Sequence, residues 1–356
     1  MPADGRAGDR GALTIGFVAR AMLVAIGLWW LAQMLWLGRE LVFVAFFSVL
    51  VSLFLSFFVD QLEEVGFPRA LAAILVMLAL LGVLVGLGAL AWPTLKAQFI
   101  TIRRELPAAL SDVERWLRTQ YQAITGQVGA PNGQVVAQLQ DRLGREVANV
   151  VAGALPLLNT VVGAVAGLLI VVVAGVYLTI ESRLYLDGVT LLVPPSARQH
   201  VRRALTDAGH DLRRWILGTV INMVTIGVLT TVGLWILGIP AALALGLIAG
   251  ILEFVPTFGP ILSAVPAVAV ALLISPAKAF WVIVLYFVIQ QLESNIMTPL
   301  VMKSAVQLPP ALTLLFTVLM AVVFGFLGLL LAVPILAATI TLVKRLYVER
   351  IEANGA

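Results

Sequence analysis

The chain has 356 residues, of which 61% are hydrophobic and 12% are charged, and its formal net charge is +4. A soluble protein carries about 25% charged residues, so these figures exclude a soluble globular domain, and the high apolar content also excludes disorder. There is no cysteine, which excludes a disulfide scaffold. Because a membrane-spanning helix needs about 20 apolar residues, we expect an all-α polytopic membrane protein with six to eight transmembrane segments.

Residues 1–92 predict a polar tail followed by three spans. Apolar runs at 13–37 and 41–59 are separated by three residues and predict a tight helical hairpin. A third run begins near residue 69 and ends at Trp92-Pro93. Tryptophans lie near the ends of these runs, where their rings favour the membrane interface.

Residues 93–154 predict a soluble insertion. Apolar side chains recur there at every third or fourth position, on both sides of a turn at 126–133 that contains Gly, Pro and Asn. Such spacing indicates two amphipathic helices. We expect a soluble helical hairpin whose apolar stripe packs on itself or on a neighbouring subunit.

Residues 155–215 predict a fourth span, at about 155–180, and a polar loop at 181–215. The loop contains six arginines, which favours a cytoplasmic position. If the N-terminus is also cytoplasmic, four spans return the chain to the same side. The insertion at 93–154 is then expected outside, and both termini, including the basic tail at 344–356, are expected in the cytoplasm.

Residues 216–343 contain a unit of one span followed by one broken apolar run, and the unit occurs twice, at about 216–275 and 279–343. Each break is followed by an Ala-Val-Pro triplet, and the halves of each run are too short to span a membrane. We interpret the runs as two re-entrant hairpins of opposite orientation, a pattern typical of transporters. Two kinked spans and two full helical hairpins remain alternatives. Candidate break and gating residues are Pro256, Gly259, Pro260, Pro299, Gly325, Gly328 and Pro334.

Two acidic residues lie between Leu212 and Val343, namely Glu253 at the first break and Glu293 near the end of the next span. An ionisable side chain in a membrane segment is costly and indicates function, and a carboxyl group held away from water favours its protonated form. The other candidate binding residues are polar neighbours of Glu293: Gln290, Gln291 and Asn295. A helix cap, an interfacial position and hydrogen bonding between helices are the structural alternatives.

Motifs of enzymes are missing from the sequence. No Gly-Lys pair occurs, so there is no Walker A loop. Both histidines, His200 and His210, lie in the arginine-rich loop, so a metal site of His and Cys ligands is not expected. We predict a protein that is not an enzyme, needs no cofactor and binds no metal or nucleic acid.

Three motifs in order resemble the autoinducer-2 exporter (AI-2E) family of bacterial transporters. They are Glu-Phe-Val-Pro-Thr-Phe-Gly-Pro at 253–260, Gln-Leu-Glu-Ser-Asn-Ile-Met-Thr-Pro at 291–299, and Phe-Gly-Phe-Leu-Gly-Leu-Leu-Leu-Ala-Val-Pro at 324–334. The chain departs from the family pattern at Ser294, where Gly is frequent, and at Pro309-Pro310, where His-Pro is frequent. The resemblance implies a permease of the bacterial inner membrane that exports a small polar signalling molecule such as autoinducer-2, and a homo-oligomer, most simply a pentamer.

Three functions are therefore open. The first is a secondary exporter, with proton coupling, whose polar site lies between the repeats. The second is a sodium/proton antiporter that uses the same glutamates, since some family members are linked to exchange of monovalent cations. The third is a passive pore or membrane scaffold whose soluble hairpin binds a partner.

Overall fold

The computed structural model describes residues 37–125, 161–256, 258–297 and 309–349, together with isolated positions between 22 and 34. All regular elements in these ranges are helices, so the all-α prediction is confirmed. Most of the predicted first span, the turn and second helix of the insertion, and the end of the tail lie outside the described residues.

The described helices follow one another along the chain with short connections. They are α2 (Arg39–Glu64), α3 (Arg69–Thr125), α5 (Val161–Ile180), α6 (Ser182–Leu191), α7 (Pro195–Ile236), α8 (Ala242–Leu252), α9 (Phe258–Ile274), α10 (Pro276–Leu292), the π-helix η1 (Glu293–Met297), α12 (Pro310–Val343) and the π-helix η2 (Lys344–Val348).

Five of the described segments are long and apolar enough to cross a membrane: Arg39–Glu64, Arg69–Ile102, Pro195–Ile236, Pro276–Met297 and Pro310–Val348. A sixth is obtained if α5 and α6, which are bent by 84° relative to one another, form one span. The apolar helices α8 and α9 are shorter. The chain is thus a multi-pass membrane protein, and its membrane helices lie in a lipid bilayer.

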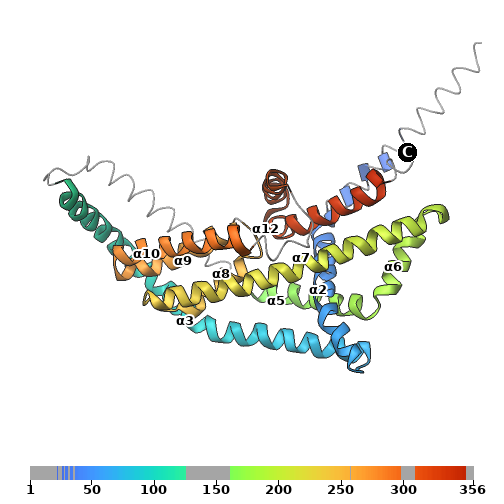
Figure 1. The fold of residues 1–356 in the computed structure, drawn as a ribbon, viewed down its shortest axis with the longest axis horizontal. Helices are drawn as coiled ribbons and strands as arrows, with labels where there is room; N and C mark the ends of the chain where they lie inside the picture. Colours follow the sequence, from blue (N-terminus) through green and yellow to red (C-terminus); the bar gives the residue numbers. More distant parts are fainter. Residues whose placement is uncertain are drawn as a thin grey trace, which may run out of the picture.

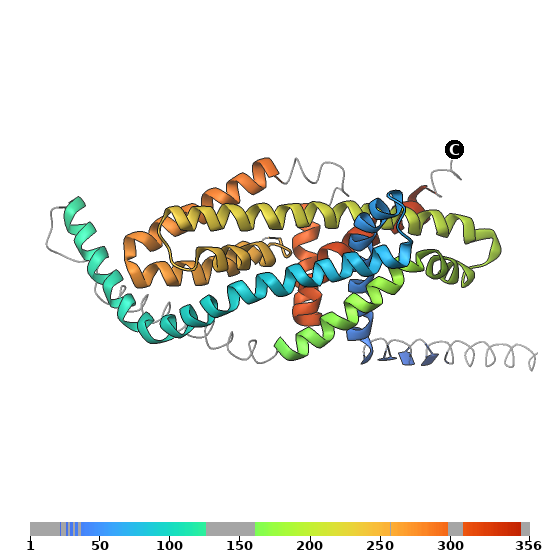
Figure 2. The same cartoon turned by 90° about the horizontal axis from the view of Figure 1, so that it is seen from below.

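Helix α3 does not end at Trp92-Pro93, and that prediction was wrong. The helix continues through Pro93 to Thr125 and has 57 residues, which is roughly 85 Å at 1.5 Å per residue. A proline inside a helix costs about 3 kcal/mol, but the turns beyond it are held by packing. Ile102 is buried in the same apolar cluster as Leu234 and Val270. The C-terminal end of α3 projects past the other helices (Figures 1 and 2).

The segment 181–215 is helical, not the loop that was predicted. It forms α6 and the first half of α7, which begins with Pro195 in its first turn, where proline is favoured. Ala204, Ala208, Leu212 and Trp215 are buried, and their spacing of three and four places them on one helix face. The predicted fifth span is thus the second half of a helix of 42 residues.

The hairpin of α8 and α9 lies between α3 and α7, as Figures 1 and 2 show. Its core is an apolar cluster that includes Leu234, Leu245 and Val270. On the other side, α10 packs against α9, and the Tyr286 hydroxyl donates to the Ser263 carbonyl at 3.1 Å. The polar end of this hairpin is therefore held inside the helical bundle.

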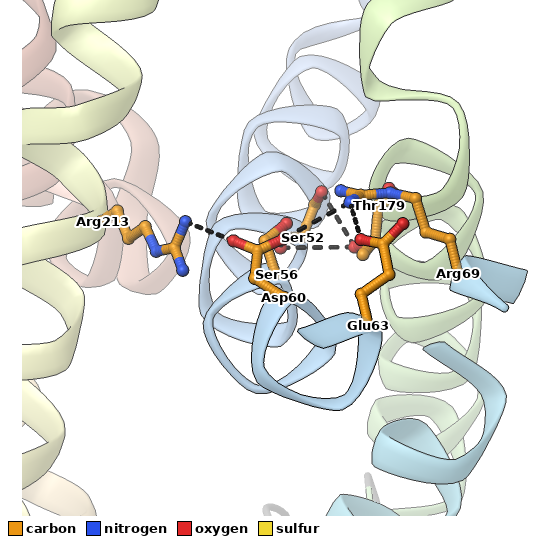
Figure 3. A network of polar contacts seen from close by, with 7 residues as sticks. All are labelled: Ser52, Ser56, Asp60, Glu63, Arg69, Thr179 and Arg213. Atoms are coloured by element: carbon orange, nitrogen blue, oxygen red, sulfur yellow. Dashed lines mark hydrogen bonds and ion pairs between the residues drawn. The ribbon is translucent and has the colours of Figure 1, made fainter. Parts of the chain in front are cut away.

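A network of polar side chains, the α2–α7 clamp, joins four helices at the turn between α2 and α3 (Figure 3). Asp60 accepts from Arg69 at 3.3 Å and from Arg213 of α7 at 2.8 Å. Arg69 also donates to Glu63 at 2.7 Å and to the Thr179 carbonyl of α5 at 2.9 Å. The clamp fixes α7 relative to α2 and α5, and α7 in turn carries part of the site described next.

Candidate functional site

Three buried polar residues from different elements meet in the bundle. Asn222 lies in the middle of α7, Glu253 follows the last residue of α8, and Glu293 begins the π-helix after α10. Their side chains are 9%, 2% and 8% exposed. An ionisable residue in such surroundings is costly unless it is paired, so this cluster is the strongest candidate for a functional site in the described residues.

Hydrogen bonds connect the members of this cluster. The amide nitrogen of Asn222 donates to Oε1 of Glu293 at 3.2 Å and makes a longer contact of 3.5 Å with Oε1 of Glu253. Gln290, one turn before Glu293, donates from Nε2 to Oε2 of Glu293 at 2.8 Å. The two carboxyl groups are close enough to interact electrostatically. One amide nitrogen thus bridges a carboxyl group from each of the two predicted repeats.

Close approach of glycines sets the depth at which Glu253 meets Asn222. Gly246 and Gly250 of α8 face Gly227 of α7, and a Cβ at Gly250 would lie 2.7 Å from the Met223 carbonyl oxygen. A Cβ at Gly246 would meet the Thr231 hydroxyl. Small residues four apart allow helix backbones in membranes to come close. The crossing places the C-terminal end of α8 next to Asn222.

The first predicted break is confirmed at the end of α8. The helix stops at Leu252, and α9 begins at Phe258. A Cβ at Gly259 would collide with the Leu252 carbonyl oxygen, so this position requires glycine for the chain to fold back. Pro256 is exposed and Pro260 is half-buried in the turn. The break lets Glu253 leave the helix facing the interior of the bundle.

The second predicted break is confirmed in α12. Gly325 has φ 66° and ψ −144°, a backbone region that is essentially restricted to glycine. Figure 1 looks down the first half of α12 and shows the second half from the side. A Cβ at Gly328 would collide with the Met320 carbonyl oxygen, eight residues earlier. Pro334 is buried in the second half.

The two breaks share one apolar cluster. Phe254, which follows Glu253, packs edge-to-face on Trp215 with ring centroids 5.8 Å apart. Phe324, which precedes Gly325, packs in the same way on Phe43 at 5.0 Å. Phe254 and Phe324 both pack against the cluster that contains Trp215, Phe43 and Met320. A displacement at one break would therefore be felt at the other.

The structure brings together some of the predicted binding residues but not all of them. Glu253, Gln290 and Glu293 are joined, whereas Gln291 and Asn295 are exposed, and no hydrogen bond among the described residues connects them to the cluster. Pro299 lies outside the described residues. A group of three or more His, Asp or Glu side chains that could hold a metal ion does not occur in the described ranges.

Sequence reasoning missed Asn222. The signal was present, because Asn222 is the one Asn or Gln between residues 216 and 236, a stretch that is otherwise apolar apart from threonines. An amide in a membrane helix needs a partner, and the two acids of the C-terminal region were the obvious candidates. The pairing of α7 with both broken repeats was not readable from the sequence.

Comparisons with known proteins agree with this architecture. A sequence model of the AI-2E family of transporters matches residues 21–347. YueF of Bacillus subtilis, named "Putative transport protein", is 26% identical over 87% of this chain and 88% of its own length. PerM of Escherichia coli K12, named "Putative permease", is 25% identical over 81% of this chain and 83% of its own. YrrI of Bacillus subtilis is 31% identical over 44% and 45%.

Proposed function

We propose a transport mechanism from one established premise: this chain belongs to the AI-2E family of transporters. The proposed function is that of a secondary transporter of the bacterial inner membrane, which exports a small polar solute in exchange for protons. Glu253, Glu293 and Gln290 form its central site. The family resemblance favours a signalling molecule of the autoinducer-2 type as the solute.

The observation that carries this proposal is the buried pair of carboxyl groups. Two negative charges in contact with one amide, surrounded by apolar helices, would repel one another without compensation. No Lys or Arg side chain bonds to them among the described residues. At least one of the charges must then be neutralised by a proton or by a bound cation. A site that must hold a proton when it is empty of other cations is suited to proton exchange.

The broken helices supply the moving parts of the proposed mechanism. Transporters with inverted repeats bind their solute near discontinuous helices and expose it by rocking one repeat against the other. Here Glu253 lies at the first break, and Phe254 and Phe324 link both breaks through one cluster. We propose that the α8–α9 hairpin and the bend at Gly325 gate the two sides of the site, with both termini in the cytoplasm.

A sodium/proton antiporter is the second candidate function, and the acidity of the site favours it. Oxygen atoms are the ligands that hard cations prefer, and the cluster offers carboxylate and amide oxygens. The organic solute and the cation are distinguished by transport alone. A homo-oligomer, a pentamer by family resemblance, is proposed for both functions.

Efflux from inverted membrane vesicles under an imposed proton gradient tests the proposed function. The assay follows autoinducer-2 and sodium in parallel for the wild type, Glu253→Gln and Glu293→Gln. Glu64→Gln is the matched control, since Glu64 is exposed at the end of α2. We expect the gradient to drive solute movement and either substitution in the site to reduce it at least tenfold.

Three other results would change the conclusion. Movement of sodium with protons, and of no organic solute, would replace the exporter by the antiporter. Normal transport by both variants would show that the glutamates are structural. Transport that proceeds without any response to the proton gradient would favour a passive pore.

A further inference from the structure

Two buried oxygen atoms of the site have no hydrogen-bond partner among the described residues. They are Oε2 of Glu253 and Oδ1 of Asn222. Both belong to side chains that are at least nine-tenths buried. A buried polar atom without a partner costs about 1–3 kcal/mol, and such atoms are uncommon in folded proteins. The two belong to residues already in contact, so they mark a single place.

The orientation of Asn222 is decided by its partners. Its Nδ2 atom bonds to both glutamates, and since an ionised carboxylate accepts hydrogen bonds and cannot donate them, the nitrogen must face the carboxyl groups. The Oδ1 atom is then turned away from them. The residue therefore holds the pair of glutamates with one end and offers an acceptor with the other.

The charge of the surroundings limits what can bind there. The described part of 216–297 contains one cationic side chain, Lys278, and its ammonium group donates to the Gly238 carbonyl at 3.2 Å. Lys278 precedes Glu293 by fifteen positions along α10 and into η1, which is roughly 22 Å of helix. An anionic solute would meet two carboxyl groups and no compensating cation, and like charges at this separation repel strongly.

We propose that Asn222, Glu253 and Glu293 form a solute-selecting subsite that accepts hydrogen-bond donors or positive charge and rejects anions. Its ligand is a neutral solute rich in hydroxyl groups or a small monovalent cation, either of which supplies what the two unpartnered oxygens lack. Asn222 binds the ligand directly through Oδ1. The inference rests on the proposed function, because it names the class of solute for the same site.

The test is the thermal stability of the purified full-length protein in detergent, followed by its tryptophan fluorescence. The probes are sodium chloride against choline chloride, and ribitol against ribitol 5-phosphate at equal ionic strength. A ligand that binds the folded state raises Tm. We expect sodium or ribitol to raise Tm by about 2 °C or more at saturation, and ribitol 5-phosphate to raise it by less than a quarter of that amount. Sodium alone identifies a cation site, and ribitol alone identifies a hydroxyl site.

Variants decide whether this subsite is responsible. Asn222→Leu and Glu253→Gln should both lose the shift. Thr230→Val is the control, because Thr230 is fully buried on the same helix, its hydroxyl has no partner among the described residues, and it belongs to no part of the cluster. Thr230→Val should keep the shift. If Asn222→Leu does not fold, Glu253→Gln, which is nearly isosteric, still gives the answer.

The inference is overturned if neither probe raises Tm, if ribitol 5-phosphate does so as well as ribitol, or if the variants in the site keep the shift. Flux of the same probe into proteoliposomes separates this inference from the proposed function. A shift without flux retains the subsite and refutes the transporter. Flux without a shift retains the transporter and refutes the subsite.

Discussion

Gln290 and Gln291 are neighbours in α10 with opposite surroundings. Gln290 is half-buried and donates to Glu293 at 2.8 Å, whereas Gln291 is exposed. Consecutive helix positions lie about 100° apart around the axis, so one of two adjacent polar residues can face the site while the other faces away. This pair offers a direct comparison of the same side chain in and out of the site.

We predict that Gln290→Leu lowers the transport rate by roughly tenfold to a hundredfold, because a hydrogen bond to a charged group contributes about 1.5–3 kcal/mol. Gln291→Leu removes the same amide from an exposed position and should transport normally. Initial rates in proteoliposomes at equal protein content check the prediction. Equal rates for the two variants would show that Gln290 does not orient Glu293.

The residues of the site were predictable from the sequence where their chemistry is rare. Two acids in a long apolar region identified Glu253 and Glu293, and Gln290 followed from its helical spacing. Gln291 and Asn295 were included because a helix is not ideal at this point. The chain changes to a π-helix at Glu293, which rotates the following residues away from their α-helical positions. Asn222 was missed because its role depends on the contact of α7 with both repeats.

At the scale of elements, the α7–α8 crossing determines where the site forms. Gly227, Gly246 and Gly250 let the two backbones touch, and Asn222 and Glu253 lie within about one turn of that contact. The separation of the helices, and not any single hydrogen bond, brings the carboxyl group to the amide.

We predict that Gly246→Ala destabilises the protein by about 1–3 kcal/mol, the usual cost of overpacking. The added Cβ would lie 2.7 Å from the Gly227 carbonyl oxygen as well as against Thr231. Gly82→Ala is the control of opposite sign. Nothing lies within 4 Å of a Cβ at Gly82 in α3, so alanine should stabilise that helix by about 0.5–1 kcal/mol. Thermal unfolding in detergent measures both, and a loss of Tm for Gly82→Ala alone would contradict the crossing.

Gly325 presents the reverse case, because space is available but the backbone is not. A Cβ there would meet nothing within 4 Å, yet its φ of 66° and ψ of −144° cost an L-residue about 1–3 kcal/mol. We predict that Gly325→Ala lowers Tm and straightens the bend, with loss of transport. The distance between spin labels on the two halves of α12 checks the bend. An unchanged distance with full transport would show that the bend tolerates any residue.

The breaks could be predicted from the sequence because glycine and proline act locally. The end of α3 could not, since Trp92-Pro93 reads as a helix end and the continuation depends on packing against distant residues such as Leu234. The same limit applies to α7, where six arginines suggested a loop although Ala204, Ala208 and Leu212 form a buried helix face.

At the scale of the whole molecule, two sets of ionic contacts anchor α7. The α2–α7 clamp holds Arg213 at one side. On the other, Arg345 of η2 pairs with Asp207 at 3.0 Å, and the Thr341 hydroxyl of α12 donates to Asp211 at 3.0 Å. The helix that carries Asn222 is thereby tied both to the N-terminal spans and to the second repeat.

We predict that Asp60→Asn lowers the stability by about 1–2 kcal/mol, because it weakens the pairs with Arg69 and Arg213, which are partly exposed. Transport at a temperature well below Tm should persist, since Asp60 does not reach the site. Glu64→Gln, in the same turn but exposed, should have no effect on Tm. High salt should reduce the difference between wild type and Asp60→Asn.

The topology of the molecule is open to a clean test because the chain has no cysteine. Ser196 of α7 and Thr119 of α3 are both exposed. We predict that Ser196→Cys reacts with a membrane-impermeant maleimide from the cytoplasmic side and that Thr119→Cys reacts from the outside. Reaction of both from one side would contradict the proposed path of the chain through the membrane.

The measurement that tests the central claim most directly is a double-mutant cycle on the two glutamates. Proton-driven transport is compared for the wild type, Glu253→Gln, Glu293→Gln and the double variant in proteoliposomes. If the two carboxyl groups act as one site, either single substitution abolishes coupling and the double variant loses no more than the worse single variant. If the losses multiply, the glutamates act independently and the shared site bridged by Asn222 does not exist.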